Sequence, residues 1–358
     1  MTSPRVRDDL VGQHAYGAPQ LDVPVRLNVN ENPFAPSAAL VETIAREVSN
    51  VARELNRYPD RDAVALRTAL ADYVTEESGG SVSVDNIWAA NGSNEVMHHL
   101  LAAYGGPGRT LVTFVPTYSM YEEYCRETFT QFKTVPRDET FAVTIEAIDQ
   151  AIALNPDIVV VCSPNNPTGT VLEPEVLNHL VSQFSGLMIV DEAYGEFRAP
   201  GTPSAVATYG GHSHVVVTRT MSKAFSCAGL RLGYAIAHPD VVAACKLVRL
   251  PYHLSAVSQA VARAALEHSQ ELLSQVDLLR EERDQLAQWL LEHNYSVAPS
   301  GANFLLFGKF SDRHQIWQGL LDHGVLIRET GPEGWLRVSI GTPQENEIFR
   351  TALISVDK

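Results

Sequence analysis

The chain has 358 residues, of which 45% are hydrophobic and 19% are charged, with a formal net charge of -15. This length and composition are ordinary for a globular enzyme with one large domain and a smaller one, and they exclude a disordered chain. The negative charge excludes a general nucleic-acid-binding surface, because such binding needs clustered Lys and Arg to neutralise phosphates.

The four cysteines are scattered, with no CxxC pair and no histidine at the spacing of a metal ligand. We therefore expect free thiols in a reducing compartment and no metal site. Neither the N-terminal stretch nor any later segment contains an apolar run long enough for a signal peptide or a membrane span. The sequence predicts a cytoplasmic protein without a membrane partner.

The first residues show no regular hydrophobic period, and we expect residues 1–30 to form an arm that lies across another part of the protein. The arm leads into LNVNENPFAPS, where Asn and Pro favour turns because Asn bonds to nearby backbone and Pro fixes φ. Helices are predicted at residues 38–55 and 62–77, joined by a turn, NRYPD, that carries Tyr58.

Strand and helix patterns alternate from residue 87 to residue 237. Apolar runs predict strands at residues 87–90, 110–115, 157–162, 186–190, 215–217 and 232–237. This alternation favours an α/β fold with a mainly parallel sheet covered on both faces. Ligands of such sheets bind at the carboxyl ends of the strands, so the polar residues that follow each run are the candidates for a site.

Polar segments follow three of these runs. Residues 91–95, Asn-Gly-Ser-Asn-Glu, open a helix, and the unpaired N–H groups and dipole of a helix start attract an anion. An ordinary N-cap by Ser93 or Asn94 explains the same residues. Tyr118 either stacks on a planar ligand or simply packs. Asn166, in SPNNPTGT, either aims its amide at a ligand or lies in a loop that only turns the chain.

Two carboxylates, Asp191 and Glu192, follow the run at residues 186–190 and precede Tyr194. Charges at the mouth of a parallel sheet are costly unless a positive group meets them. A protonated ring nitrogen is one such partner.

Lys223 follows the run Val215-Val216-Val217 after a predicted polar turn at residues 218–222. Its amine is therefore expected at the carboxyl edge of the sheet. Thr220, Ser222 and Arg231 suggest a phosphate anchored beside that amine. The alternative is a lysine on the solvated surface.

The pattern changes after residue 255. Long amphipathic helices are predicted at residues 255–268 and 270–293, followed by strands and helices that alternate. The later strands are expected at residues 295–298, 303–308, 325–328 and 335–340, with helices at residues 312–322 and from residue 344. We therefore expect an N-terminal arm (residues 1–30), a large domain (31–255) and a small α/β domain (256–358) that the arm completes.

Taken together, these motifs resemble the fold-type I, pyridoxal-phosphate-dependent aminotransferases. NPTG, DEAY after an apolar strand, and SK followed by Arg231 occur in that family's order and spacing. The resemblance implies that Lys223 binds pyridoxal phosphate covalently and moves the proton, while Asp191 keeps the pyridine nitrogen protonated. The other cofactor contacts that it implies are Asn166 and Tyr194 at the phenolic oxygen, Tyr118 stacked on the ring, Ser93, Asn94, Thr220, Ser222 and Arg231 at the phosphate, and Tyr58 from a second subunit of a homodimer.

Within that superfamily, the chain is most similar to the histidinol-phosphate aminotransferases. LNVNENPF, LNRYP, PTYSMY, SPNNPTGT, RTMSKAF, AGLRLGY and LPYHLS all match their pattern. The resemblance implies amino transfer between histidinol phosphate and 2-oxoglutarate, with glutamate as a product, in histidine biosynthesis. The substrate-binding residues that it implies are Arg337, which would clamp a carboxylate, with Arg328, Tyr16, Tyr252 and Asn32. Core or interface packing is the alternative role for each tyrosine.

Of three other functions, the sequence leaves two open and argues against the third. An aromatic amino-acid aminotransferase would use the same cofactor motifs, because phenyl and imidazole rings are both flat. Decarboxylation of a phosphorylated amino acid would keep the cofactor and change the reaction. A cofactor-bound transcription regulator would need a basic DNA-binding module, for which the short, weakly charged arm has no room.

Overall fold

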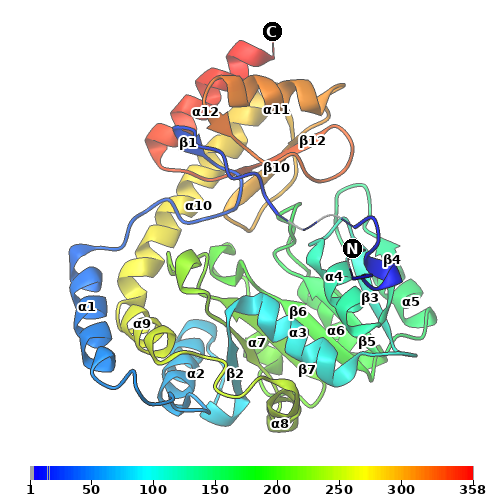
Figure 1. The fold of residues 1–358 in the computed structure, drawn as a ribbon. Coiled ribbons are helices and arrows are strands. Elements are labelled where there is room, and N and C mark those ends of the chain that lie inside the picture. The colour runs from blue at the N-terminus through cyan, green and yellow to red at the C-terminus, as the bar shows by residue number, and fades with distance from the viewer. Residues whose placement is uncertain (1–3, 14, 16, 358) are drawn as a thin grey trace.

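A seven-stranded sheet lies at the centre of the larger part of the molecule (Figure 1). The computed structural model describes residues 4–13, 15 and 17–357. The strand order is β2-β8-β7-β6-β5-β3-β4; neighbours from β4 to β7 are parallel, and β8 is antiparallel to both β7 and β2. The strands are β2 (Ile87–Ala90), β3 (Thr110–Val115), β4 (Gln131–Pro136), β5 (Ile158–Cys162), β6 (Leu187–Asp191), β7 (Val215–Thr220) and β8 (Gly233–Ile236). The predicted mainly parallel α/β fold is confirmed.

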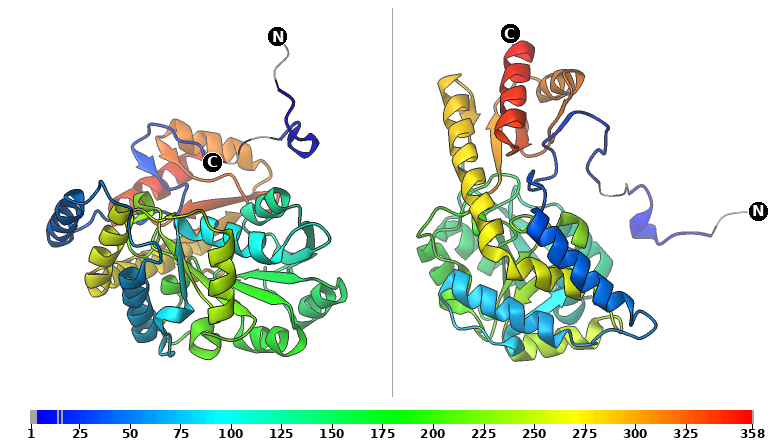
Figure 2. Two further views of the ribbon diagram at one scale, coloured as in Figure 1. Left: turned by 60° about the horizontal axis from the view of Figure 1, so that its bottom comes forward. Right: turned by 90° about the vertical axis from the view of Figure 1, so that its left-hand side faces the viewer.

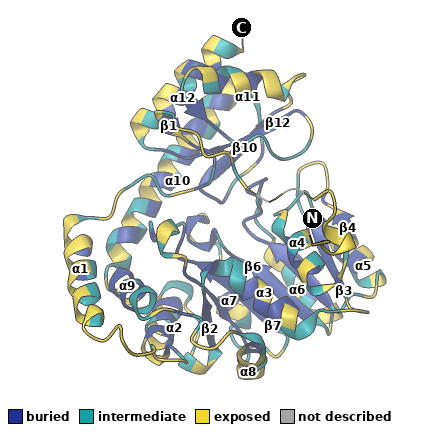
Figure 3. Cartoon of the chain, in the orientation of Figure 1, coloured by how far each residue is buried: buried dark blue, intermediate teal, exposed yellow. Residues whose placement is uncertain are grey.

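Helices cover both faces of this sheet, which explains why its central strands are almost wholly apolar. In β5, Ile158 and Val160 point into one buried cluster, and Val159 and Val161 point into the other. The first cluster contains α3 (Gly92–Tyr104), α4 (Met120–Thr128) and α8 (Pro239–Val248). The second contains α2 (Val64–Ser78), α5 (Ile145–Ala153), α6 (Pro174–Gln183) and α7 (Ala205–Tyr209). Figure 3 shows the central strands of the sheet as buried.

Two predictions about this sheet were wrong. Strand β4 was missed, because QFKTVP carries polar residues on an edge strand that is exposed over much of its length. The run at residues 215–217 was expected to end in a turn, yet β7 continues to Thr220. Its last residues are polar and still buried, since Thr218 and Arg219 find partners inside the protein.

A smaller sheet lies beyond the large one, in the order β12-β10-β9, and is antiparallel throughout. It consists of β9 (Ser296–Val297), β10 (Phe304–Gly308) and β12 (Trp335–Ser339), with α11 (Arg313–Asp322) and α12 (Pro343–Val356) packed beside it. Helix α10 (Ser269–Glu292) runs from the large sheet to the small one (Figure 1). Leu272, Val276, Leu279, Leu286 and Leu290 line its buried face, as its predicted helical period requires.

The N-terminal segment joins the C-terminal part of the chain. Strand β1 (Val25–Arg26) pairs in parallel with β11 (Val325–Leu326). This pairing supports the expectation that the arm completes the small domain. The division into residues 1–30, 31–255 and 256–358 stays a prediction.

Helix α1 (Ala38–Ala52) lies beside α9 (Ala256–Glu267), with α2 next to them (Figure 2). Only Leu40 and Thr43 of α1 are buried, so most of this helix faces outward (Figure 3). Ser37 and Ser255 begin α1 and α9 by accepting first-turn N–H groups, which accounts for the sharp starts of both helices. Within the described part of the chain, no helix combines the length and apolar character needed to cross a bilayer.

Candidate active site

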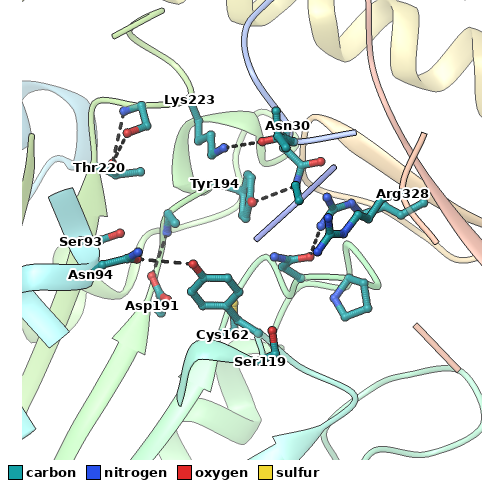
Figure 4. A pocket seen from close by; sticks show the side chains of 18 of the residues that line it. Asn30, Ser93, Asn94, Ser119, Cys162, Asp191, Tyr194, Thr220, Lys223 and Arg328 are labelled. Carbon is teal, nitrogen blue, oxygen red and sulfur yellow. Dashed lines mark hydrogen bonds between the residues drawn. The ribbon is translucent and has the colours of Figure 1, made fainter. Parts of the chain in front are cut away.

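A cavity of about 230 Å³ opens at the carboxyl ends of β5, β6 and β7, where they face the smaller sheet (Figure 4). Most of the predicted site residues line it. They are Ser93, Asn94, Tyr118, Asn166, Asp191, Tyr194, Thr220, Ser222, Lys223, Arg231, Arg328 and Arg337. Segments far apart in the sequence therefore meet at one edge of the sheet, as the parallel strands require.

Lys223 lies just beyond β7 and points its amine into the cavity. Its Nζ donates to the Val29 carbonyl at 2.9 Å. Burial, followed by the positive charges of Arg337 and Arg231, lowers the pKa of Lys223 to about 7. The alternative of a solvated surface lysine is wrong. An amine with this pKa is partly neutral near pH 7, so it can act as a nucleophile and a base.

Asp191 ends β6 inside the cavity and is held by neutral donors. Tyr121 Oη donates to Oδ2 at 2.7 Å, and Thr218 Oγ1 donates to Oδ1 at 2.9 Å. The Ala193 N–H also donates to Oδ1, at 3.3 Å. Burial raises the pKa of the Asp191 carboxyl, and these hydrogen bonds oppose that rise. The carboxylate can therefore meet a cationic N–H group of a ligand.

Glu192 points away from the cavity, although it is the next residue. Its carboxylate pairs with Arg198 at 2.9 Å and with Arg219 at 2.8 Å. These arginines oppose the effect of burial, and the pKa of Glu192 is lowered. Of the two carboxylates at this strand end, only Asp191 lines the cavity.

The start of α3 and the segment after β7 form a cradle at one end of the cavity. Asn91 is the N-cap residue, so the alternative N-cap by Ser93 or Asn94 is wrong; both lie in the first turn and face the cavity (Figure 4). Gly92 has φ +82°, and a Cβ there would come within 2.8 Å of the Arg231 guanidinium. Arg231 Nη1 donates to Ser222 Oγ at 3.3 Å. A helix start, two hydroxyls and an arginine suit a phosphate group.

Two arginines from the C-terminal part enter the opposite side of the cavity. Arg337 Nη1 donates to Asn166 Oδ1 at 2.5 Å, and its Nη2 donates to the Asn28 carbonyl at 2.9 Å. Arg328 Nη2 donates to the Gly17 carbonyl at 3.3 Å, and the backbones of Arg328 and Arg337 form a bridge. The positive charges of this wall suit a second anionic group.

Four predicted residues lie elsewhere or are not described. Tyr58 has a relative exposure of 79% and stacks on Tyr252, with ring centroids 4.4 Å apart and planes 14° apart. Asn32 accepts the Phe34 N–H at 3.0 Å. Tyr58, Tyr252 and Asn32 are not among the described residues that line the cavity. Tyr16 lies outside the described residues.

The sequence interpretation missed several residues of the site. Asn28 and Asn30 line the cavity, and the Asn30 amide donates to Tyr194 Oη at 2.9 Å. Their alternation in LNVNENPF was the available signal, because an extended segment places alternate residues on one side. The contact of Tyr121 with Asp191 has no signal in the sequence, where Tyr121 is one more aromatic residue near a strand end.

This chain is similar to known proteins of one family over nearly its whole length. The family model for "Aminotransferase class I and II" matches residues 23–353. A protein of Burkholderia lata named histidinol-phosphate aminotransferase 3 is 55% identical over 98% of this chain and 95% of its own length. A histidinol-phosphate aminotransferase of Thermobifida fusca is 54% identical over 98% of this chain and 95% of its own length.

A solved structure gives the same picture of the fold. The histidinol-phosphate aminotransferase of Sinorhizobium meliloti, solved in complex with pyridoxal 5'-phosphate, superposes with a TM-score of 0.83 at 23% identity. The match covers 93% of this chain and 91% of that one. At this identity, the likeness shows the fold.

Proposed function

Because this chain belongs to the class I and II aminotransferases, we propose that it transfers an amino group between L-histidinol phosphate and 2-oxoglutarate. The products are imidazole-acetol phosphate and L-glutamate, and the reaction is a step of histidine biosynthesis. The observation that carries the proposal is the position of the Lys223 amine, between a phosphate cradle, a buried carboxylate and two arginines.

The cofactor is pyridoxal 5'-phosphate, and the residues present fit it. When bound, this cofactor supplies an aldehyde that combines with amines and a protonated ring that withdraws electrons from the substrate carbon. The residues at one end of the cavity that would hold the phosphate are Ser93, Asn94, Thr220, Ser222 and Arg231. The Asp191 carboxylate matches a ring N–H, because its present partners are all neutral donors.

Lys223 holds the cofactor and moves the proton in this proposal. Its pKa of about 7 keeps a fraction of the amine neutral, so Nζ can take a proton from the substrate carbon and return it. The Val29 carbonyl, 2.9 Å away, orients Nζ.

Asn166 and Tyr194 would bind the phenolic oxygen of the cofactor. Arg337 occupies Asn166 Oδ1, so the amide NH2 of Asn166 is the part that donates. The Tyr194 oxygen accepts from Asn30, which leaves its O–H to donate. Tyr118, at the cavity wall, would stack on the cofactor ring.

Arg337 and Arg328 bind the substrates. Both line the cavity on the side of the smaller sheet, so they can meet the carboxylate of 2-oxoglutarate and the phosphate of histidinol phosphate in turn. Tyr252, which stacks on Tyr58, would act with it at the partner's cavity in this proposal. Substrate roles for Tyr16 and Asn32 stay predictions, because Tyr16 lies outside the described residues and the Asn32 side chain accepts the Phe34 N–H.

We also propose a cytoplasmic homodimer in which Tyr58 reaches the cavity of the partner. The described surface around Tyr58 and Tyr252 exposes large apolar side chains, as an interface does before assembly. They include Leu55 at 60%, Leu247 at 86% and Leu250 at 73% relative exposure.

Steady-state assays with histidinol phosphate and with phenylalanine as amino donors test the function. We expect a larger kcat/KM for histidinol phosphate. An equal or larger value for phenylalanine would instead favour an aromatic amino-acid aminotransferase. Product analysis separates transamination from decarboxylation.

Trapping the cofactor with sodium borohydride tests the role of Lys223. Mass spectrometry should find the reduced adduct on Lys223, and Lys223→Ala should lose it. Lys246→Ala, which changes an exposed lysine of α8, should keep the adduct. An adduct at another residue would refute the assignment.

A further inference from the structure

Asp191 is held differently at its two oxygens. Oδ1 accepts from Thr218 Oγ1 at 2.9 Å and from the Ala193 N–H at 3.3 Å. Oδ2 accepts from Tyr121 Oη at 2.7 Å. A carboxylate oxygen accepts about two hydrogen bonds, so Oδ2 is the oxygen with room for a ligand N–H.

The Tyr121–Asp191 bond has a fixed direction. Tyr121 is fully buried, and burial, followed by the negative charge of Asp191, raises its pKa well above the ordinary value. The phenol therefore keeps its proton and donates it to the carboxylate. Burial favours the neutral acid at Asp191, and the Tyr121 hydrogen bond is the largest effect that opposes it.

Tyr121 is also held rigidly in place. It lies in the first turn of α4, and its ring meets Tyr118 edge to face, with centroids 5.6 Å apart and planes 89° apart. Tyr118 lines the cavity. One helix start thus presents a ring to the cavity and a hydroxyl to the carboxylate at its floor.

We propose that Tyr121 is a positioning residue, which aims Asp191 Oδ2 at the ring nitrogen of the cofactor and keeps that carboxylate ionised. This inference rests on the proposed function, because it assumes that pyridoxal phosphate binds with its ring nitrogen at Asp191. Tyr121 acts only through Asp191 and does not touch the reacting atoms.

A comparison of two ligands tests the proposal. The cofactor-free full chain is titrated with pyridoxal phosphate and with its 1-deaza analogue, in which carbon replaces the ring nitrogen. Both ligands carry the aldehyde and the phosphate, so they differ only at the atom that faces Asp191. We expect the wild type to prefer pyridoxal phosphate.

Tyr121→Phe should reduce this preference about tenfold, the factor expected when a charged acceptor loses one hydrogen bond. Thr218→Val removes a donor to Oδ1 and should also reduce the preference for pyridoxal phosphate. This variant replaces Tyr121→Phe in the test if Tyr121→Phe does not fold. If Tyr121 had a purely structural role, the substitution would weaken the binding of both ligands equally. An unchanged ratio in a folded variant, or a wild type without preference, would overturn the proposal.

Tyr73→Phe is the matched control. The Tyr73 hydroxyl is also buried and donates to a buried carboxylate, Glu196, at 3.4 Å, but neither residue lines the cavity. Its ligand preference should equal that of the wild type. The proposed function fails separately, if the wild type carries no borohydride-trapped cofactor on Lys223.

Discussion

Replacing Arg219 by methionine should destabilise the protein strongly, because this side chain neutralises a buried cluster of carboxylates. Arg219 is fully buried. It lies 2.8 Å from Glu192, 2.9 Å from Glu196 and 3.2 Å from Glu77. Methionine fills a similar volume without charge, so the substitution isolates the electrostatic role.

The structure sets the size of the loss. Removing one partner of a buried ion pair costs about 3–5 kcal/mol. Glu192 would keep Arg198 at 2.9 Å, and the Glu77 side chain is 16% exposed and can gain water. Glu196 is then the main uncompensated charge, and we expect a loss near the lower end, about 3 kcal/mol.

Urea unfolding at constant protein concentration measures this loss. Arg109→Met is the control, because Arg109 pairs with Asp157 at 2.7 Å while its side chain is 58% exposed. That change should cost less than about 1 kcal/mol. A loss below about 1 kcal/mol in Arg219→Met would refute the reasoning.

The loss should also depend on pH. Burial raises the pKa of Glu196, and Arg219 opposes this rise, so its removal raises that pKa further. Between the pKa of Glu196 in the unfolded chain and its higher pKa in the folded variant, the folded variant binds a proton that the unfolded chain has released. In this range, the stability of the variant falls by about 1.4 kcal/mol for each unit by which the pH rises. The variant should therefore be closest to the wild type at acidic pH, and a loss that grows towards pH 5 would contradict this sign.

Three further outcomes follow from the site. The rate at which the cofactor-free chain captures pyridoxal phosphate at Lys223 should rise from pH 6 to pH 8 and then become constant, because the pKa of Lys223 is about 7 and only the neutral amine reacts. Absorbance measures this rate, and a rate that still rises at pH 9 would contradict the prediction. Gly92→Ala should weaken cofactor binding at least about tenfold, since its Cβ would meet Arg231, whereas Gly108→Ala, with φ +84° and nothing within 4 Å, should leave the titrated affinity unchanged. Tyr58→Ala should weaken the dimer in sedimentation, unlike Leu291→Ala on α10, whose side chain is also exposed; an active monomeric wild type would remove the interface.

The central strands could be predicted from the sequence because their burial is two-sided. In β5, in β6 up to Val190 and in the first half of β7, every residue faces one apolar layer or the other, so each strand is an unbroken apolar run over that length. Strand β4 has only one neighbour in its sheet, and most of its residues keep some exposure. Its mixed composition therefore resembles a loop.

The site could be predicted where position in the fold decides it. Lys223, Asp191 and Asn166 follow strands whose ends meet at one edge, so order along the chain was enough. The contacts of Tyr121 and Arg219 could not be predicted in this way. Both depend on which side chains from other elements lie opposite, and hydrophobic periodicity carries no information about that.

The two consecutive carboxylates at the end of β6 have different surroundings: Asp191 lines the cavity, and Glu192 lies in a buried cluster of ion pairs. Alternate side chains of a strand point to opposite faces, so Asp191 and Glu192 diverge. Glu192 is neutralised internally by Arg198 and Arg219, whereas no Lys, Arg or His of the described residues forms an ion pair with Asp191. Lys223, Arg231, Arg328 and Arg337 line the same cavity without pairing to it. In the proposed function, the Asp191 carboxylate is therefore available to a ligand that is positive at its ring and negative at its ends.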